Sequence, residues 1–218
     1  MKKVAVILSG SGVYDGSELQ EAIVTLLSLD RAGVQAVCFA PNIEQHHVIN
    51  HLTGEEDSAA SRNVLVEAAR INRGDVQDLA NCVVEEFDGV VVVGGFGVAK
   101  NLSDFAINGA QSTVDSTTLF ALKEFSKLSR PALYMCIAPA LLPCVYGKGV
   151  ELTIGNDPAT IEAIEAMGGI HIERDVEGIV VDETRQVIST PAYMLAQSIS
   201  QAATGIENGV TQLVKMMA

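Results

Sequence analysis

The chain contains no tryptophan, few other aromatic residues and few basic residues. Aromatic residues make up 5% of its 218 positions, and 14 basic residues stand against 27 acidic ones, a net charge of -13. Because an acidic surface repels phosphates, this balance argues against binding to nucleic acid or to an anionic membrane. Hydrophobic residues account for 48% of the chain, which excludes disorder and predicts a sizeable, mainly aliphatic core.

Long apolar runs and metal-ligand motifs are also missing. No apolar run approaches the ~20 residues that a membrane-spanning helix needs. The four cysteines are Cys38, Cys82, Cys136 and Cys144. None of them forms a Cys-x-x-Cys pair or lies in a histidine-rich cluster, so we expect neither a metal site nor a cofactor. A chain of this size folds without disulfides, which favours a cytoplasmic protein with reduced thiols.

Apolar runs alternate with helical patterns along the chain. Runs typical of strands buried on both faces occur at 4–8, 34–39, 90–93 and 132–135. Helical patterns occur at 17–27, 61–73, 115–128, 138–144, 160–167 and 194–217, with Ser17 as the expected N-cap of the first. The runs at 179–181 and 187–189 flank a polar turn and predict a hairpin.

This alternation predicts an α/β fold. We expect a single domain over residues 1–218, a three-layer α/β/α sandwich with a mainly parallel, doubly wound (flavodoxin-like) sheet. Ligands of such folds bind beyond the carboxyl ends of the strands, which selects the loops at 9–17, from 41 onward, at 94–101 and at 136–139. The polar stretch 43–60 is long enough to be a lid or binding loop.

Cys136 directly follows a predicted strand and precedes a predicted short helix. Free N–H groups and the helix dipole at such a turn lower the pKa of a thiol. The geometry resembles the strained turn that exposes the nucleophile of some hydrolases. The sequence therefore predicts a reactive thiol at Cys136, with a buried cysteine that only packs as the alternative.

Two other features lie in the selected loops. Gly94-Gly95-Phe96-Gly97 follows a strand, where its backbone N–H groups form either an oxyanion hole or a tight turn. Glu18 lies in the first turn of the first predicted helix. There a carboxylate either stabilises the helix dipole or stands beside the Cys136 sulfur and exchanges a proton with it. Ser11, Tyr14, Asn101 and His51 are further pocket candidates, although His51 also fits an ordinary surface position.

Two resemblances to known motifs carry less weight. The Ser9-Gly10-Ser11-Gly12 loop resembles a phosphate-binding loop, but Asp15 and Glu18 oppose a phosphate, which argues against nucleotide binding. His171-Ile172-Glu173 imitates the His-x-Glu of glutamine amidotransferases. We interpret it as a coincidence, because it lies soon after Cys136 and within a short predicted strand.

Taken together, these motifs resemble one protein superfamily. The matching stretches are 8–18, 38–41, 51–55, 94–102, 135–140 and 190–197, and they span nearly the whole chain. The sequence resembles the ThiJ/PfpI superfamily, whose fold is that of class I glutamine amidotransferases, and within it the ElbB (enhancing lycopene biosynthesis) branch. The resemblance implies a homodimer and an association with isoprenoid biosynthesis.

The same resemblance implies a chemistry. Its nucleophile is Cys136, its carboxylate partner is Glu18, and its backbone donors are Gly95 and Phe96 on one side and Ile137 on the other. The implied activity is that of a cofactor-free glyoxalase, which converts the small dicarbonyls glyoxal or methylglyoxal to glycolate or lactate; repair of glycated protein is a related activity. Many superfamily members carry a histidine where this chain has Ile137, so we expect a slow enzyme.

Two alternative functions are a redox protein that uses the same two residues and a glutaminase that needs a further one. In a redox sensor or chaperone-like binding protein, Cys136 would be oxidised to a sulfinic acid that Glu18 hydrogen-bonds. In a glutaminase, a triad histidine would be needed, and none of the four histidines (His46, His47, His51 and His171) adjoins Cys136 in the sequence.

Overall fold

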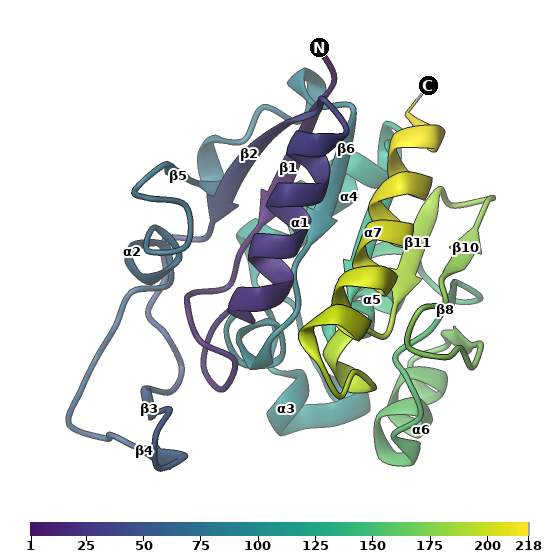
Figure 1. Cartoon of the computed structure of the whole chain (residues 1–218). Coiled ribbons are helices and arrows are strands. Elements are labelled where there is room, and N and C mark those ends of the chain that lie inside the picture. Colours follow the sequence, from purple (N-terminus) through teal and green to yellow (C-terminus); the bar gives the residue numbers. More distant parts are fainter. Residues whose placement is uncertain (218) are drawn as a thin grey trace.

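Figure 1 shows a computed structural model of the chain, which describes residues 1–217. A seven-stranded sheet has the order β10-β11-β7-β6-β1-β2-β5, and every neighbouring pair is parallel except β10 and β11. Its strands are β1 (Lys3–Ile7), β2 (Gln35–Ala40), β5 (Val76–Asp78), β6 (Gly89–Val92), β7 (Ala132–Met135), β10 (Val180–Asp182) and β11 (Val187–Thr190). The chain winds outward from β1 in both directions, so the ends of β1, β6 and β7 meet where ligands bind in such folds.

Helices cover both faces of the sheet (Figure 1). The face toward the viewer carries α1 (Leu19–Arg31), α2 (Val64–Ala68) and α7 (Ile199–Met216), and the far face carries α4 (Ser116–Lys127) and α5 (Leu142–Tyr146). Below the strand ends lie α3 (Phe105–Asn108) and α6 (Pro158–Ala166). Two small ribbons pair β3 (Ile49–Asn50) with β4 (Glu55–Glu56) and β8 (Glu151–Leu152) with β9 (Ile170–His171). Within residues 1–217, every helix is too short or too polar to cross a bilayer.

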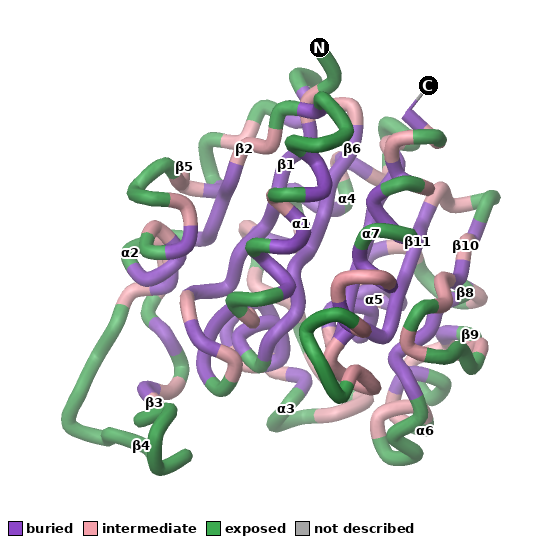
Figure 2. The backbone as a smooth tube through the Cα atoms, in the orientation of Figure 1, coloured by how far each residue is buried: buried purple, intermediate pink, exposed green. Residues whose placement is uncertain are grey.

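Two hydrophobic clusters, one on each face of the sheet, form the core. The cluster under α1 and α7 includes Val6 and Val91 and has no aromatic side chain among its buried members. The other cluster holds Phe39, Phe87 and Phe125, whose ring centroids lie 5.5 and 6.3 Å apart in turn. Figure 2 shows the central strands buried along their length, whereas the loop that carries β3 and β4 is largely exposed.

The predicted fold class is confirmed. The apolar runs at 4–8, 34–39, 90–93 and 132–135 form β1, β2, β6 and β7, and the predicted hairpin is the antiparallel pair of β10 and β11. These strands were predictable because a strand covered by helices on both faces is apolar at every position.

The predicted N-cap of the first helix was wrong. The cap of α1 is Glu18, whose side chain accepts a hydrogen bond from the Glu21 N–H. The Ser17 hydroxyl is buried instead against the loop after β1, where its Oγ accepts from the Ser9 N–H at 2.8 Å. The helix therefore begins after Glu18, and its first turn contains Glu21.

Two other helices are shorter than predicted. The pattern at 61–73 yields only α2, because the chain turns after Ala68 and reaches a positive φ of 56° at Arg73. The terminal helix begins at Ile199 with Ser198 as its N-cap. Residues 192–194 form a separate 3-10 turn, which brings Tyr193 to the first turn of α1.

Candidate active site

Cys136 lies at the turn that leads out of β7. Its backbone has a φ of 57°, in the left-handed region that side chains other than glycine rarely adopt, and its N–H donates to the Thr190 carbonyl at 3.0 Å. A 3-10 turn from Ala138 to Leu141 follows, and α5 continues it. The thiol is 7% exposed and lines a cavity. A strained residue held at the end of a central strand has the geometry expected of an exposed nucleophile.

Glu21 is the carboxyl group beside this thiol. It is fully buried, and its Oε1 accepts a hydrogen bond from the Tyr193 N–H at 3.1 Å. Its Oε2 has no conventional hydrogen-bond partner among residues 1–217. A Cβ built on Gly94 would lie 2.4 Å from both this oxygen and the Cys136 Cβ. Glycine at position 94 therefore leaves the space in which thiol and carboxyl face each other.

Burial sets the protonation of this pair. It raises the pKa of Glu21 to about 8, although the N–H of Tyr193 and the thiol of Cys136 favour the carboxylate. Burial also raises the pKa of the Cys136 thiol well above its ordinary value, and the Glu21 carboxyl adds to this rise. The predicted lowering of the Cys136 pKa was therefore wrong, because loss of solvation outweighs the N–H groups at the turn.

Glu18 lies one helical turn away from this position. Its Oε2 accepts the Glu21 N–H at 2.7 Å, so the carboxylate caps α1, and burial raises its pKa. The Glu18 N–H donates to the Gly94 carbonyl at 3.0 Å. In a capping box, the glutamate at the position of Glu21 would take that N–H; here it is already satisfied, and the Glu21 carboxyl turns inward. The structure thus brings Glu21, rather than the predicted Glu18, to the sulfur.

A sequence signal for Glu21 exists in the helical pattern. Glu21, Thr25 and Ser28 follow one another on the buried side of α1, next to Ala22 and Leu29. Charged residues almost never lie fully buried without a partner or a task. A glutamate on the apolar stripe of a helix, close to the carboxyl end of β1, was therefore a stronger candidate than the glutamate at the helix start.

Two of the three predicted backbone donors act on the thiol. Hydrogen bonds from the N–H groups of Gly95 and Ile137 lower the pKa of Cys136, against the larger effect of burial. The Phe96 N–H donates to the Val13 carbonyl at 2.8 Å, so Phe96 was wrongly predicted as a donor. Its half-exposed ring lines the cavity instead.

Asn101 and His51 tie two loops together outside this cavity. Asn101 lies in a single π-helical turn (Val98–Leu102), where its Nδ2 donates to the Ser9 and Asp15 carbonyls, each at 2.9 Å. The His51 Nε2 accepts the Tyr14 N–H at 3.2 Å and lies 3.7 Å from the buried Asp15 Oδ1. The His51 contacts fasten the 43–60 loop to the loop after β1, and the Asn101 Oδ1, which accepts the His46 N–H at 2.9 Å, fastens it to the π-helical turn.

The four further pocket candidates are therefore not cavity residues. Ser11 lies in the same junction, since a Cβ on Gly16 would approach its N at 2.3 Å. None of Ser11, Tyr14, Asn101 and His51 lines the described cavity beside Cys136. The side chains of Asn101 and His51 hold one loop to another, a task that a sequence pattern does not separate from ligand binding.

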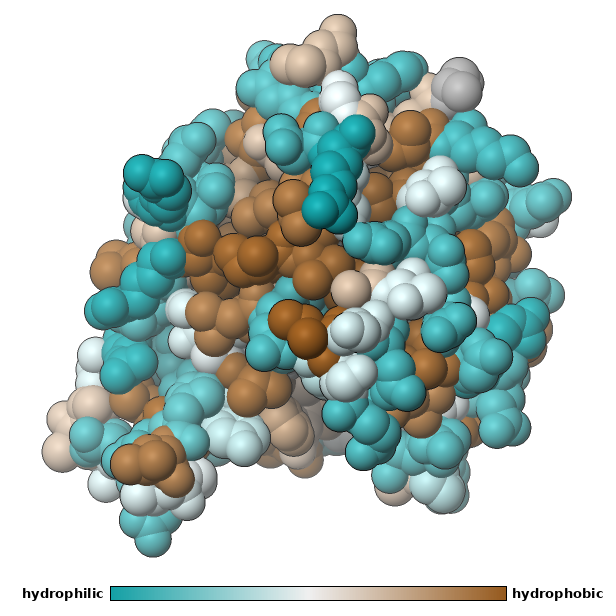
Figure 3. Space-filling view, viewed as in Figure 1, coloured by the Kyte–Doolittle hydropathy of each residue, from teal (hydrophilic) through white to brown (hydrophobic). Residues whose placement is uncertain are grey.

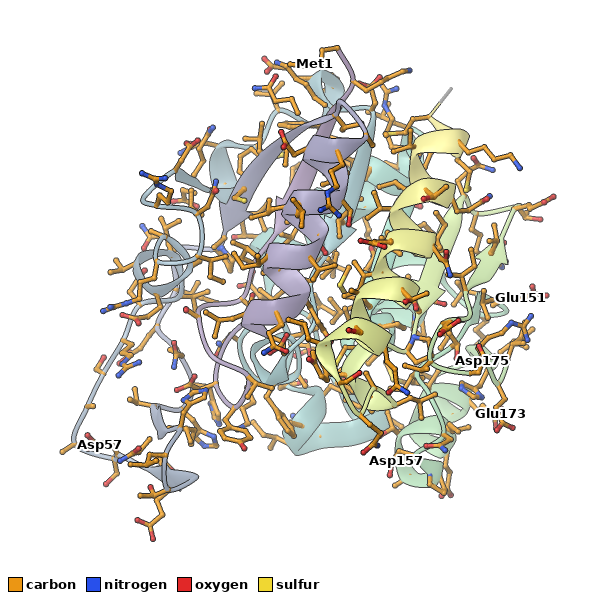
Figure 4. All side chains as sticks on the ribbon, in the orientation of Figure 1. Met1, Asp57, Glu151, Asp157, Glu173 and Asp175 are labelled. Carbon is orange, nitrogen blue, oxygen red and sulfur yellow. The ribbon has the colours of Figure 1, made fainter. Side chains whose placement is uncertain are left out.

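A cavity of about 580 Å³ opens beside Cys136. Its walls come from the turns after β6 and β7 and from α3, α6 and the 3-10 turn at Ala192–Met194. The lining residues are Val13, Gly95, Phe96, Ala99, Phe105, Ala106, Gly109, Cys136, Ile137, Asp157, Ala159, Thr160, Ala163, Tyr193 and Met194. Figure 4 labels Asp157 at the start of α6, below the strand ends. Among residues 1–217, no cluster of histidine, cysteine and carboxylate side chains is arranged to hold a metal ion.

The fold and the site together are those of a class I glutamine amidotransferase-like domain. The sheet, the strained cysteine after β7 and the inward carboxyl of α1 are its elements. The chain matches no protein-family model. It is 40% identical over 223 residues to the human protein "Glutamine amidotransferase-like class 1 domain-containing protein 3, mitochondrial", covering 98% of this chain and 83% of that one. The chain therefore belongs to the family of that protein.

Solved structures agree with this assignment. An isoprenoid biosynthesis protein with an amidotransferase-like domain from Ehrlichia chaffeensis superposes with a TM-score of 0.93 at 36% identity, over 100% of both chains. A two-domain protein from Anabaena variabilis with DJ-1/ThiJ/PfpI-like and ferritin-like domains shares the fold, with a TM-score of 0.60 at 16% identity over 98% of this chain and 48% of that one. The resemblance drawn from the sequence motifs is confirmed.

Proposed function

We propose that the protein is a cofactor-free glyoxalase in which Cys136 is the nucleophile and Glu21 its proton partner. The observation that carries the proposal is the buried Cys136–Glu21 pair at the end of a cavity, with the N–H groups of Gly95 and Ile137 directed at the sulfur. A carboxyl whose pKa lies at about 8 both accepts and donates a proton near neutral pH, which general acid–base catalysis requires.

The reaction balances without an external oxidant. The Cys136 sulfur bonds to the aldehyde carbon of a 2-oxoaldehyde, and the thiol proton passes through Glu21 to the carbonyl oxygen, giving a hemithioacetal. Glu21 then takes the proton from that carbon and returns it to the neighbouring carbon through an enediol, which leaves a thioester beside an alcohol. Water cleaves the thioester, and the 2-hydroxy acid and the thiol are released. One carbon is oxidised and its neighbour is reduced.

We expect slow turnover. The side chain that follows the nucleophile is Ile137, which transfers no proton, so every proton step falls to Glu21 or to water. The high pKa of Cys136 also keeps most of the sulfur as thiol at neutral pH. Both features lower the rate without preventing the reaction.

The alternative functions are tested by different observations. Burial raises the pKa of Cys136, which slows oxidation of the sulfur by peroxide just as it slows attack on an aldehyde, so a redox sensor stays the alternative that peroxide treatment followed by mass spectrometry of Cys136 tests. A glutaminase needs a histidine at the nucleophile, and the cavity walls within residues 1–217 contain none. Protein deglycation would use the same thiol on a larger substrate, and it is a second activity that the same chemistry allows.

A homodimer is part of the proposal. Leu19, Ile23 and Leu27 form one exposed stripe along the outer side of α1 and are 43%, 49% and 43% exposed. Figure 3 shows a hydrophobic surface over this helix. Burial of such a stripe against a second copy would stabilise an isologous dimer. Ile23→Glu should convert the dimer to a monomer in light scattering; a monomeric wild type would contradict the proposal.

The cellular setting also stays a prediction. The Ehrlichia chaffeensis neighbour is named an isoprenoid biosynthesis protein, and the human relative carries "mitochondrial" in its name. For this chain we propose a cytoplasmic enzyme associated with isoprenoid output. Cell fractionation, and isoprenoid levels in a strain without the protein, test these two statements separately.

Direct quantification of product tests the activity. Wild type should form glycolate from glyoxal or lactate from methylglyoxal above the blank. Cys136→Ser and Glu21→Gln should each lower kcat/KM at least ~100-fold, the usual scale for loss of a nucleophile or acid–base group. Glu18→Gln, which keeps a capping oxygen, should retain activity within a few-fold. Equal acid formation by wild type and Cys136→Ser would overturn the proposal.

A further inference from the structure

The cavity is much larger than glyoxal or methylglyoxal. Its volume is about 580 Å³, within the range of roughly 300–1,000 Å³ that proteins use for drug-sized ligands. A dicarbonyl of two or three carbons fills the space of only a few waters, each with a liquid volume of about 30 Å³. Such a substrate would leave most of the cavity to solvent.

The walls away from the thiol are apolar. Phe96, Phe105 and Met194 contribute large side chains, and Ala159 and Ala163 of α6 leave room between them. Alanines at the wall of a helix give depth to a cavity that larger side chains would fill. The walls therefore match a hydrophobic substituent rather than a polar one.

The charged residues of the cavity walls also favour a neutral ligand. Asp157 is the one charged residue among its described walls, and its Oδ2 already accepts the Thr160 N–H at 2.9 Å and the Thr160 Oγ1 at 2.6 Å. No lysine or arginine lines the described cavity. No described wall residue would balance the charge of an anionic ligand, and the exposed Asp157 at the start of α6 would oppose it, which disfavours carboxylates and phosphates.

On the basis of the proposed chemistry at Cys136, we propose that the preferred substrates are neutral 2-oxoaldehydes with a bulky apolar substituent. The aldehyde lies at the sulfur, near the N–H groups of Gly95 and Ile137, and the substituent fills the space between Phe96, α3 and α6. Phenylglyoxal has this chemistry. Its conversion to mandelate adds one water, reduces the ketone carbon to an alcohol and oxidises the aldehyde carbon to a carboxylic acid. Cys136 is regenerated.

Turnover of two substrates by three proteins tests the assignment. For wild type, kcat/KM for phenylglyoxal should exceed that for glyoxal about tenfold or more, because burial of a phenyl ring favours binding by that order. Ala159→Phe, which places a ring in the cavity wall on α6, should lower this ratio at least about fivefold. Ala166→Phe, on the same helix and exposed like Ala159 but outside the cavity walls, is the matched control and should leave both the ratio and glyoxal turnover unchanged.

A binding measurement distinguishes failure of this inference from failure of the proposed function. 2-Hydroxyacetophenone keeps the phenyl ring but has no aldehyde, so calorimetry measures its binding without turnover. We expect binding to wild type and to Ala166→Phe, and at least about fivefold weaker binding to Ala159→Phe. If neither aldehyde yields acid but this pattern holds, the glyoxalase proposal fails and the ligand class stands. If the ketone does not bind and Ala159→Phe leaves the substrate ratio unchanged, the ligand class is overturned.

Discussion

The Oε2 of Glu21 and the Cβ of Cys136 each lie 2.4 Å from the point where a Cβ on Gly94 would stand. Glu21 lies in α1 and Cys136 follows β7, and Gly94, two residues after the end of β6, lies between their side chains. Glycine there is required by space, because its φ is not in the left-handed region. The carboxyl and the thiol thus face each other only because the intervening residue has no side chain.

Gly94→Ala should therefore disrupt the pair directly. The added methyl would overlap both groups and the nearby Met135 carbonyl, which costs about 1–3 kcal/mol of stability. It should also abolish Cys136-dependent turnover. Denaturant unfolding and product formation measure the two effects. Gly54→Ala is the control: its Cβ meets no atom within 4 Å, so only the strain of its φ of +76° applies. Equal losses in both variants would contradict the steric explanation.

The raised pKa of Glu21 predicts a pH-dependent stability. The pKa is about 8 in the folded protein against an ordinary value of 4.5, so the unfolded chain releases this proton first. The contribution of Glu21 to stability is complete below pH 4.5 and is lost as pH rises toward 8. At about 1.4 kcal/mol per pKa unit, the loss is on the order of 3–5 kcal/mol.

Glu21→Gln removes this titration. The free energy of unfolding of Glu21→Gln relative to wild type should therefore rise by a few kcal/mol between pH 5 and pH 8, measured by urea unfolding at each pH. Glu165→Gln, a change at an exposed position of α6, should show no such trend. If the two free energies of unfolding differ by the same amount across this pH range, Glu21 does not have a raised pKa in the folded protein.

The charge of Glu21 should also control the reactivity of Cys136. Above pH 8 the carboxyl is ionised and opposes the thiolate, because burial leaves the two charges unscreened. Glu21→Gln should alkylate with iodoacetamide at a rate close to wild type at pH 7 and several-fold faster at pH 9. Peptide mass spectrometry follows Cys136, with the half-buried Cys82 as an internal reference. A slower reaction of Glu21→Gln at pH 9 would show that the Glu21 carboxylate favours the Cys136 thiolate, against this prediction.

The sequence predicted the sheet and the cysteine far better than the details of the site. β6 and β7 are buried at every position, so their composition reveals them, and Cys136 was identified by its place after β7. The edge strand β5, of three residues with only partial burial, carries no such signal. Glu21 was missed because the choice between Glu18 and Glu21 depends on where α1 begins, and helix ends are poorly defined by pattern.

The remaining errors have tertiary causes. The Phe96 N–H was predicted to be free, but the Val13 carbonyl, from a loop far away in the sequence, takes it. The thiol pKa was predicted from the turn alone, while burial by the surrounding elements decides its direction. Neither effect is contained in the residues near Cys136, so no local pattern would have found it.

The last prediction concerns the 43–60 loop, which Figure 4 shows extending away from the sheet, with Asp57 labelled at its outer end. The side chain of Asp15 is fully buried, and its Oδ2 accepts the Ile49 N–H at 2.7 Å. A hydrogen bond to a buried carboxylate contributes about 1.5–3 kcal/mol, so its loss should free the loop. Asp15→Ala should therefore be cleaved by a glutamate-specific protease at Glu55 and Glu56 about tenfold or more faster than wild type.

Asp57→Ala provides the matched control for this loop. Asp57 is exposed, and its Oδ1 accepts only the Ala59 N–H at 3.2 Å, two residues away. Cleavage of Asp57→Ala should therefore stay within about twofold of wild type. Unfolding in urea, measured in parallel, distinguishes local release of the loop from global destabilisation, since only the latter exposes sites in α1 and α7. If Asp15→Ala is cleaved at the wild-type rate, the junction with Tyr14 and His51 holds the loop without the Asp15 carboxylate.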